Sequence, residues 1–105
     1  MTHPAGELND VVHQRVRLGI LAVLAEAKRA DFTFVRDSLG LTDGNLARHL
    51  QVLERAGYIT TEKAFERRKP RTWVRVTRQG TDALAQEIAA LRALIARAES
   101  GRRSK

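Results

Sequence analysis

Apolar residues recur at helical spacing in residues 42–56, which predicts a helix with one buried face. The leucines that define this face follow at intervals of four and three: Leu46, Leu50 and Leu53. Thr42 can cap the helix with its hydroxyl, and Gly57 can end it in a left-handed conformation, with Tyr58 folding back. The opposite face is polar and basic, so it is either solvated or used to read a partner.

Another helix is expected to run from about Asn9 or Asp10, both good caps, to about Lys28. Its apolar residues lie on two sides. One side can cover the chain's own core, and the other predicts contact with a second subunit.

A short helix is expected between these two, within residues 31–40. Asp31 or Thr33 can cap it, and Gly40 can follow its end in a left-handed conformation. Its apolar residues are predicted to point inward: Phe34, Val35 and Leu39. The order is therefore helix, tight turn, helix.

Residues 58–65 and 71–77 are rich in β-branched and aromatic side chains, and residues 66–70 between them are polar and basic. This pattern predicts a β-hairpin with a basic tip, in the manner of a wing. Alternation divides the second strand into two faces, with Val74 and Val76 on one and Trp73 and Arg75 on the other. Trp73 is expected to pack rather than to stack on a base.

A last helix is predicted over residues 78–99, capped by Thr77. Its apolar residues step by four and three as in a heptad seam: Leu84, Ile88, Leu91, Ile95 and Ala98. We interpret it as a dimerisation helix, although it could instead fold back on its own core. Residues 100–105 are expected to be a disordered basic tail. The chain as a whole, residues 1–105, is expected to form one domain with a core at about 10–77.

Charge then narrows the choice of partner. The chain has 19 basic and 12 acidic residues, a net charge of +7 and a pI near 11.0, which favours a polyanion. The absence of cysteine excludes disulfides and thiolate chemistry. Without a long apolar run or a leader-like N-terminus, we expect a soluble, cytoplasmic protein.

Catalysis is not indicated. His3, His13 and His49 lack the spacing of a metalloprotease motif, and the glycines form no phosphate-binding loop after a strand. Asp10 and His13 could form half of a metal site shared across a dimer, but a surface pair at this spacing is usually no ligand set. We therefore predict no enzyme, no cofactor and no metal site.

Three strings, "VRLGIL" at 16–21, "DFTFVRDSLGLTDGNLARHLQVLERAGYI" at 31–59 and "RRKPRTWVRVTRQGTDAL" at 67–84, carry a family resemblance. The chain resembles winged helix-turn-helix transcription regulators of the MarR and ArsR type, close to the small stand-alone winged helix DNA-binding domains. The resemblance implies a mainly α fold with a small β-hairpin and a long C-terminal dimerisation helix.

The resemblance also implies binding of double-stranded DNA by a dimer, with residues 42–56 in the major groove and the hairpin over a neighbouring minor groove or the backbone. It assigns DNA contact to the start of the recognition helix: Thr42, Asp43, Gly44, Asn45, Arg48 and His49. Relatives often have Ser or Pro where Gly44 stands, so we expect close backbone approach at this position rather than base contact.

The chemistry of these side chains suits the role. Arg48 can donate to guanine O6 and N7, and Asn45 can pair with adenine N6 and N7. Thr42 lies at a helix N-terminus that can hold a phosphate. Asp43 is expected to cap the helix or to accept from cytosine N4. His49 is expected to pack, with its polar tip toward the DNA backbone.

Weaker candidates for DNA contact lie farther along the chain. Gln51 is a second-choice reader, and Arg55 is expected to reach only phosphate or solvent. The hairpin tip offers cations for phosphate or minor-groove contact: Arg67, Arg68, Lys69 and Arg71. The alternatives are a solvated helix face and a tip that only adds solubility.

Together these features predict a homodimeric regulator, expected to be a repressor, on an inverted-repeat operator. Its dimer contacts are predicted at Val11, Leu18, Leu21, Leu84, Ile88, Leu91 and Ile95. The alternatives are a winged-helix protein-interaction module and a nonspecific architectural DNA-binding protein. A small-molecule effector would fit such a regulator, but no residue identifies one.

Overall fold

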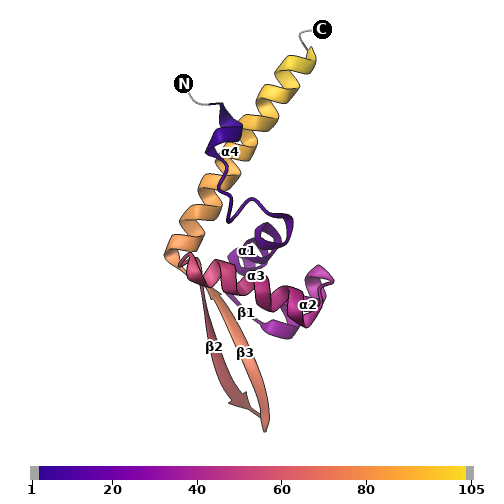
Figure 1. Ribbon diagram of the computed structural model, residues 1–105, viewed down its shortest axis with the longest axis vertical. Helices are drawn as coiled ribbons and strands as arrows, with labels where there is room; N and C mark the ends of the chain where they lie inside the picture. Colours follow the sequence, from indigo (N-terminus) through magenta and orange to yellow (C-terminus); the bar gives the residue numbers. More distant parts are fainter. Residues whose placement is uncertain (1–2, 104–105) are drawn as a thin grey trace.

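The computed structural model describes residues 3–103, and Figure 1 shows how its elements are arranged. The elements are the 3-10 helix η1 (Pro4–Glu7), helix α1 (Arg15–Ala27), strand β1 (Arg29–Asp31), helices α2 (Phe32–Leu39) and α3 (Asp43–Arg55), strands β2 (Ile59–Glu66) and β3 (Lys69–Val76), and helix α4 (Arg78–Arg103). Helices α1 to α3 form a body from which the β2–β3 hairpin and α4 project in opposite directions. The extents of 62 × 25 × 21 Å reflect these two projections. The predicted class, mainly α with a small β-hairpin and a long C-terminal helix, is confirmed.

Helix α3 forms as its leucine spacing predicts. Its three leucines are buried in the core with side chains from α1, α2, β2 and β3. The helix ends in a Schellman motif, because Gly57 has φ of 81° and the Tyr58 N–H donates to the Leu53 carbonyl at 3.0 Å. One face of α3 is therefore fixed to the body, and the opposite face is free of it.

The first long helix begins later than expected. Helix α1 starts at Arg15, so the predicted start at Asn9 or Asp10 is wrong. The Gln14 side chain caps the helix by accepting hydrogen bonds from two of its first backbone amides, both at 2.9 Å. Asn9 instead caps a turn, since its Oδ1 accepts from the amides two and three residues further on. Local side-chain bonds of this kind compete with helix formation.

Helix α2 is capped by Asp31, as expected, and the glycine that follows it is left-handed. Val35 is buried and Leu39 packs against the core, as predicted. Phe34 is 55% exposed, so its predicted inward orientation is wrong. The helix begins at Phe32, and this residue, rather than Phe34, shares the inward face with Val35 and Leu39 at helical spacing.

The sheet has three antiparallel strands in the order β1-β3-β2. Strand β1 has only three residues, and the sequence pattern did not predict it. Val74 is buried and packs from the face that Val76 shares, as expected. The pairing of Glu66 with Lys69 continues the ladder, so the predicted five-residue tip is too long and only Arg67 and Arg68 form the turn.

Helix α4 is capped by Thr77, whose Oγ1 accepts from the Gly80 N–H at 3.0 Å, as predicted. The helix continues to Arg103, so the expected disorder of residues 100–103 is wrong, and residues 104–105 lie outside the described residues. Arginines in the last turn favour this extension because they complement the negative end of the helix dipole. Within residues 3–103, no helix is both long enough and apolar enough to cross a membrane.

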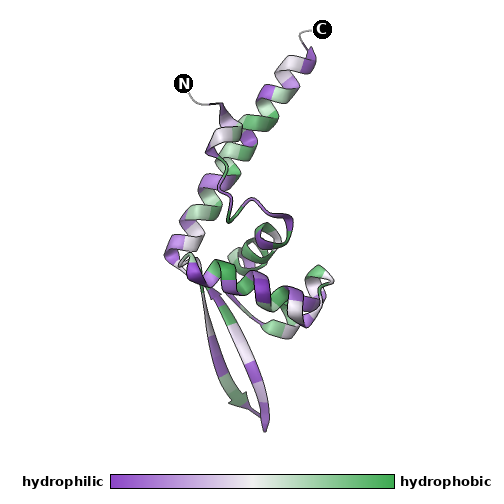
Figure 2. Ribbon diagram, in the orientation of Figure 1, coloured by the Kyte–Doolittle hydropathy of each residue, from purple (hydrophilic) through white to green (hydrophobic). Residues whose placement is uncertain are grey.

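The residues predicted to form a dimer fall into two groups. Some belong to the core of one chain or pack against it: Val11, Leu18, Leu21 and Leu84. Leu21 and Leu84 are buried there, so neither side chain is available to a second copy in this structure. On α4, Ile88 is 41% and Ile95 is 56% exposed, and Leu91 lies between them, partly buried. The apolar positions of α4 therefore face the body near its start and solvent farther along. Figure 2 shows that hydrophobic residues recur along this helix.

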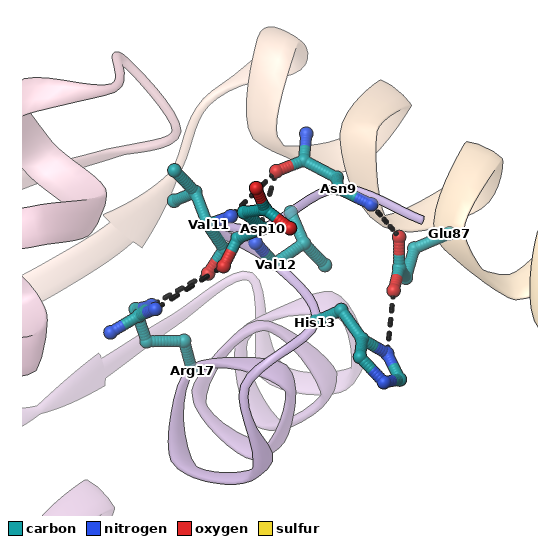
Figure 3. A network of polar contacts seen from close by, with 7 residues as sticks. All are labelled: Asn9, Asp10, Val11, Val12, His13, Arg17 and Glu87. Carbon is teal, nitrogen blue, oxygen red and sulfur yellow. Dashed lines mark hydrogen bonds and ion pairs between the residues drawn. The ribbon is translucent and has the colours of Figure 1, made fainter. Parts of the chain in front are cut away.

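A buried carboxylate attaches the N-terminal segment to α4. Glu87 is 1% exposed, and its Oε1 accepts from the Asn9 N–H at 2.8 Å while its Oε2 lies 2.8 Å from His13 Nδ1 (Figure 3). The Asn9 side chain also donates to the Tyr58 hydroxyl at 3.0 Å. These bonds connect α4 to the body through residues that precede α1.

The start of α4 lies close against the base of the hairpin at Gly80. A Cβ added there would overlap the backbone carbonyl oxygen of Tyr58. We expect Gly80→Ala to lower the free energy of unfolding by about 1–3 kcal/mol, because the backbone must move to relieve the overlap. Denaturant titration measures this. Gly101→Ala is the matched control, since a Cβ at Gly101 has open space, and an equal loss in both variants would contradict the assignment.

Candidate nucleic-acid interface

The first turn of α3 is exposed and is connected to α2 by an ion pair. Thr42 Oγ1 accepts from the Asn45 N–H at 3.1 Å, which confirms the predicted cap. The Asp43 carboxylate lies 2.8 Å from Arg36 Nη1, and Arg36 also binds Asp37 at 2.9 Å. The hydrogen bond to Asp37 and then that to Asp43 raise the pKa of Arg36 above its ordinary value. Arg36 engages only Oδ1 of Asp43, so the ion pair holds this carboxylate while Oδ2 can still accept a hydrogen bond.

The two expected base readers lie together one turn into α3. Arg48 Nη2 donates to Asn45 Oδ1 at 3.3 Å, and both side chains are exposed. A guanidinium has five N–H donors, so Arg48 keeps most of them for another partner. This arrangement places a planar cation beside a carboxamide on the helix face opposite the buried leucines.

His49 lies at the edge of the buried face of α3, half-buried, where it contacts α1. Arg17 Nη1 lies 3.2 Å from His49 Nδ1, and an arginine can only donate, so Nδ1 accepts and the ring proton is on Nε2. Burial, followed by the charges of Arg17 and Arg48, lowers the pKa of His49 below its ordinary value. The histidine is therefore neutral near pH 7.

A groove of about 540 Å³ separates α3 from the hairpin, and we call it the α3–hairpin groove. Arg48 and Gln51 line it from α3, and Thr61, Lys63 and Thr72 line it from the strands. Sequence reasoning missed Lys63, although strand alternation places it on the same face as Thr61. The groove is thus bordered by cations and hydrogen-bonding side chains from two elements.

The inner end of the groove is less basic. Glu54 lines it, and its Oε2 accepts from the Thr61 hydroxyl at 3.0 Å. Arg55 is exposed at the end of α3 and does not line the groove. The positions suited to an anion are therefore those nearer the start of α3.

The hairpin tip is a two-residue turn with an unusual composition. Arg67 has φ of 52° and Arg68 has φ of 64°, so both are left-handed, as a type I′ turn requires. Asn and Gly usually occupy these positions, because glycine has no Cβ and the short side chain of asparagine can hydrogen-bond to the nearby backbone, whereas arginine is strained there. Two arginines at the tip, followed by Lys69, concentrate positive charge at the expense of conformational stability.

Arg71 differs from the other cations of the hairpin. Its guanidinium lies 3.2 Å from Asp31 and 3.6 Å from Glu66, so it binds carboxylates within the chain. Trp73 Nε1 donates to Glu66 at 3.1 Å, and the Arg29 guanidinium lies 4.1 Å from the Trp73 ring centroid. This cluster, named here the back cluster, makes Trp73 a packing residue, as expected, and stiffens the hairpin.

The structure gives no support to a metal site at Asp10 and His13. His13 faces Glu87, and Asp10 contributes a backbone carbonyl to Arg17 at 3.3 Å. Across residues 3–103, no three His, Asp or Glu side chains are grouped as a metal would require.

A capped helix after a tight turn, a neighbouring basic hairpin and a long final helix define a winged helix DNA-binding protein. The chain belongs to the winged helix DNA-binding domain family, whose sequence pattern matches residues 16–95.

Known proteins agree with this assignment. A transcriptional regulator homologue from Pyrococcus horikoshii OT3 is 34% identical and superposes with a TM-score of 0.84 over 90% of this chain and 95% of its own. An uncharacterized protein of Methanocaldococcus jannaschii is 36% identical over 73 residues, 70% of this chain and 79% of that protein. The crystal structure of MarR shares the fold, with a TM-score of 0.73 and 21% identity over 86% of this chain and 65% of MarR. The predicted resemblance to winged helix DNA-binding domains is confirmed, and the fold is that of MarR.

Gly44, the second residue of α3, is exposed, and a Cβ added there would meet nothing within 4 Å. The fold therefore does not require glycine at this position. A partner that comes within van der Waals distance of the backbone at Gly44 would require glycine there.

We expect Gly44→Ala to raise the free energy of unfolding by up to about 1 kcal/mol, because alanine favours a helix. The same change should weaken duplex binding, since the methyl group separates the helix from DNA. Thermal unfolding and a duplex titration of the same preparation measure the two effects. Unchanged or tighter DNA binding would contradict close backbone approach.

Proposed function

We propose that this protein is a sequence-specific transcriptional repressor that binds double-stranded DNA as a homodimer. The observation that carries the proposal is the pair of Asn45 and Arg48, exposed on α3 beside the α3–hairpin groove. In the proposed complex α3 enters the major groove, where Arg48 donates to a guanine and Asn45 pairs with an adenine. The protein would act by occluding a promoter.

The DNA backbone is the proposed occupant of the α3–hairpin groove. Gln51 lines it from α3 and Lys63 lines it from β2, and both can bind a phosphate. Beyond the groove, Arg67, Arg68 and Lys69 would contact phosphates at the neighbouring minor groove. The net charge of +7 supports a polyanionic partner. We propose no catalytic role and a cytoplasmic location, in keeping with a family defined by DNA binding.

Base reading and phosphate binding can be separated by substitution. On a duplex selected from a random pool, Arg48→Ala should cost roughly 1–3 kcal/mol of binding free energy and relax the preference at one base pair. On unrelated duplexes the loss should be smaller.

The matched variant replaces the strained turn. Arg67→Asn with Arg68→Gly should weaken binding to all duplexes alike and reduce the salt slope by about one per lost phosphate contact. It should also raise the free energy of unfolding by about 1 kcal/mol, since Asn and Gly fit a type I′ turn. Equal losses on selected and unrelated DNA for Arg48→Ala would refute base reading. Wild-type binding to duplexes no tighter than to heparin would refute the function.

The exposed apolar residues of α4 support self-association. Ile88 and Ile95 lie two turns apart, and in a single chain they are 41% and 56% exposed. In a dimer with half-site centres about one helical turn of DNA apart, these side chains would be buried against the second copy.

We expect the wild type to sediment as a dimer at micromolar concentration and Ile88→Lys with Ile95→Lys to sediment as a monomer, because charged groups oppose burial. Phe34→Lys is the control, since it alters an exposed apolar residue on α2. A monomeric wild type would contradict the homodimer.

A further inference from the structure

The hairpin carries an exposed aromatic side chain next to its basic tip. Phe65 is 73% exposed, the largest exposed fraction among the bulky apolar residues of the described chain. It lies in β2 directly opposite Pro70 in β3, one pair before the closing pair of the turn. Figure 2 shows hydrophobic colour at this end of β2 beside the hydrophilic tip. Burial of such a ring on a partner would be strongly favourable.

Phe65 lies on the face of the hairpin that continues the α3–hairpin groove. Residues paired across antiparallel strands share a face, and alternate residues along a strand do too. Phe65 and Pro70 therefore share a face with Lys63 and Thr72, which line the groove opposite Arg48. A molecule that fills the groove and extends toward the hairpin tip would contact Phe65 after Lys63.

Charge on this face favours an anion. Within the hairpin, which the structure describes in full, both carboxylates, Glu62 and Glu66, pair with residues of the other face. Glu66 is also engaged in the back cluster with Arg71 and Trp73. The groove-side face of the hairpin carries one charged side chain, Lys63, and across the groove α3 contributes Arg48, with Glu54 at the inner end. Near Phe65 the charge is therefore positive, which suits a polyanion whose stacked bases also offer apolar surfaces.

The part of the hairpin that carries Phe65 is held by contacts within the chain. The back cluster ties β2 and β3 to Asp31 at the end of β1. Pro70, which pairs with Phe65 in the ladder, has a fixed backbone angle, and the turn that joins the strands has only two residues. The Phe65 ring is therefore presented to a partner by a restrained backbone.

We propose that Phe65, paired with Pro70, is a wedge that enters the DNA minor groove and partly unstacks one base step, while the arginines of the tip hold the flanking phosphates. This assignment rests on the proposed function. A phenyl ring has no hydrogen-bonding group, so the step is selected by how easily it deforms, and pyrimidine–purine steps such as TA or CA deform most readily. Phe65 therefore adds sequence preference outside the bases that α3 reads.

The test uses the full chain and a duplex selected from a random pool by the wild type. 2-Aminopurine replaces each adenine in turn beside the α3 site, because its fluorescence increases when its base is unstacked. Wild-type binding should increase the signal at one step. Phe65→Ala should abolish that increase and weaken binding roughly tenfold. Phe34→Ala, which alters the other largely exposed phenylalanine, should leave both unchanged.

The possible outcomes distinguish the role of Phe65 as a wedge from the proposed DNA-binding function. If Arg48→Ala weakens binding while Phe65→Ala changes neither affinity nor the fluorescence pattern, the wedge is refuted and the DNA-binding function stands. A lower sedimentation coefficient of Phe65→Ala without DNA would also refute it, because Phe65 would then contact a second copy. If the wild type binds no duplex, both assignments fail. Equal thermal unfolding of Phe65→Ala and the wild type confirms that the variant is folded.

Discussion

The hydroxyl of Thr77 holds together the point at which three elements meet. It donates to the Gly57 carbonyl at 2.7 Å and accepts from the Gly80 N–H at 3.0 Å, while the Thr77 N–H donates to the Tyr58 carbonyl at 3.0 Å. Through these bonds the end of α3, the base of the hairpin and the start of α4 occupy fixed relative positions. The separation between α3 and the hairpin, and hence the groove between them, depends on this junction.

Features with a local physical cause could be predicted from the sequence. Thr42 and Thr77 cap helices because a hydroxyl binds free amides wherever it precedes a helical pattern, and Gly57 ends α3 because it tolerates a left-handed backbone. Asn9 misled the prediction because its carboxamide bonds equally well to a turn. Strand β1 could not be predicted, because three residues are too few to show the alternation of a strand and its pairing partner lies more than forty residues away.

The candidate site was predictable in its residues but not in its connections. Helical spacing places Asn45 and Arg48 outward, yet only the folded chain brings Lys63 to the same groove as Gln51 or engages Arg71 with Asp31. The same holds for Glu87, which the heptad pattern treats as an ordinary solvated position. It is buried because residues far away in the sequence, near Asn9, supply its partners.

The length of helix α4 beyond the body has a consequence for the half-site spacing that a dimer would recognise. From Ile95 to Arg103 every residue is exposed, so about nine residues, or roughly 13 Å of helix, extend past the body. In the proposed dimer, two such arms pair. A shift of their pairing by one helical turn would displace the two bodies by about 5.4 Å, more than the rise of one base pair. The spacing of the half-sites would then be encoded in the apolar register of α4, while α3 encodes their sequence, and the two could evolve independently.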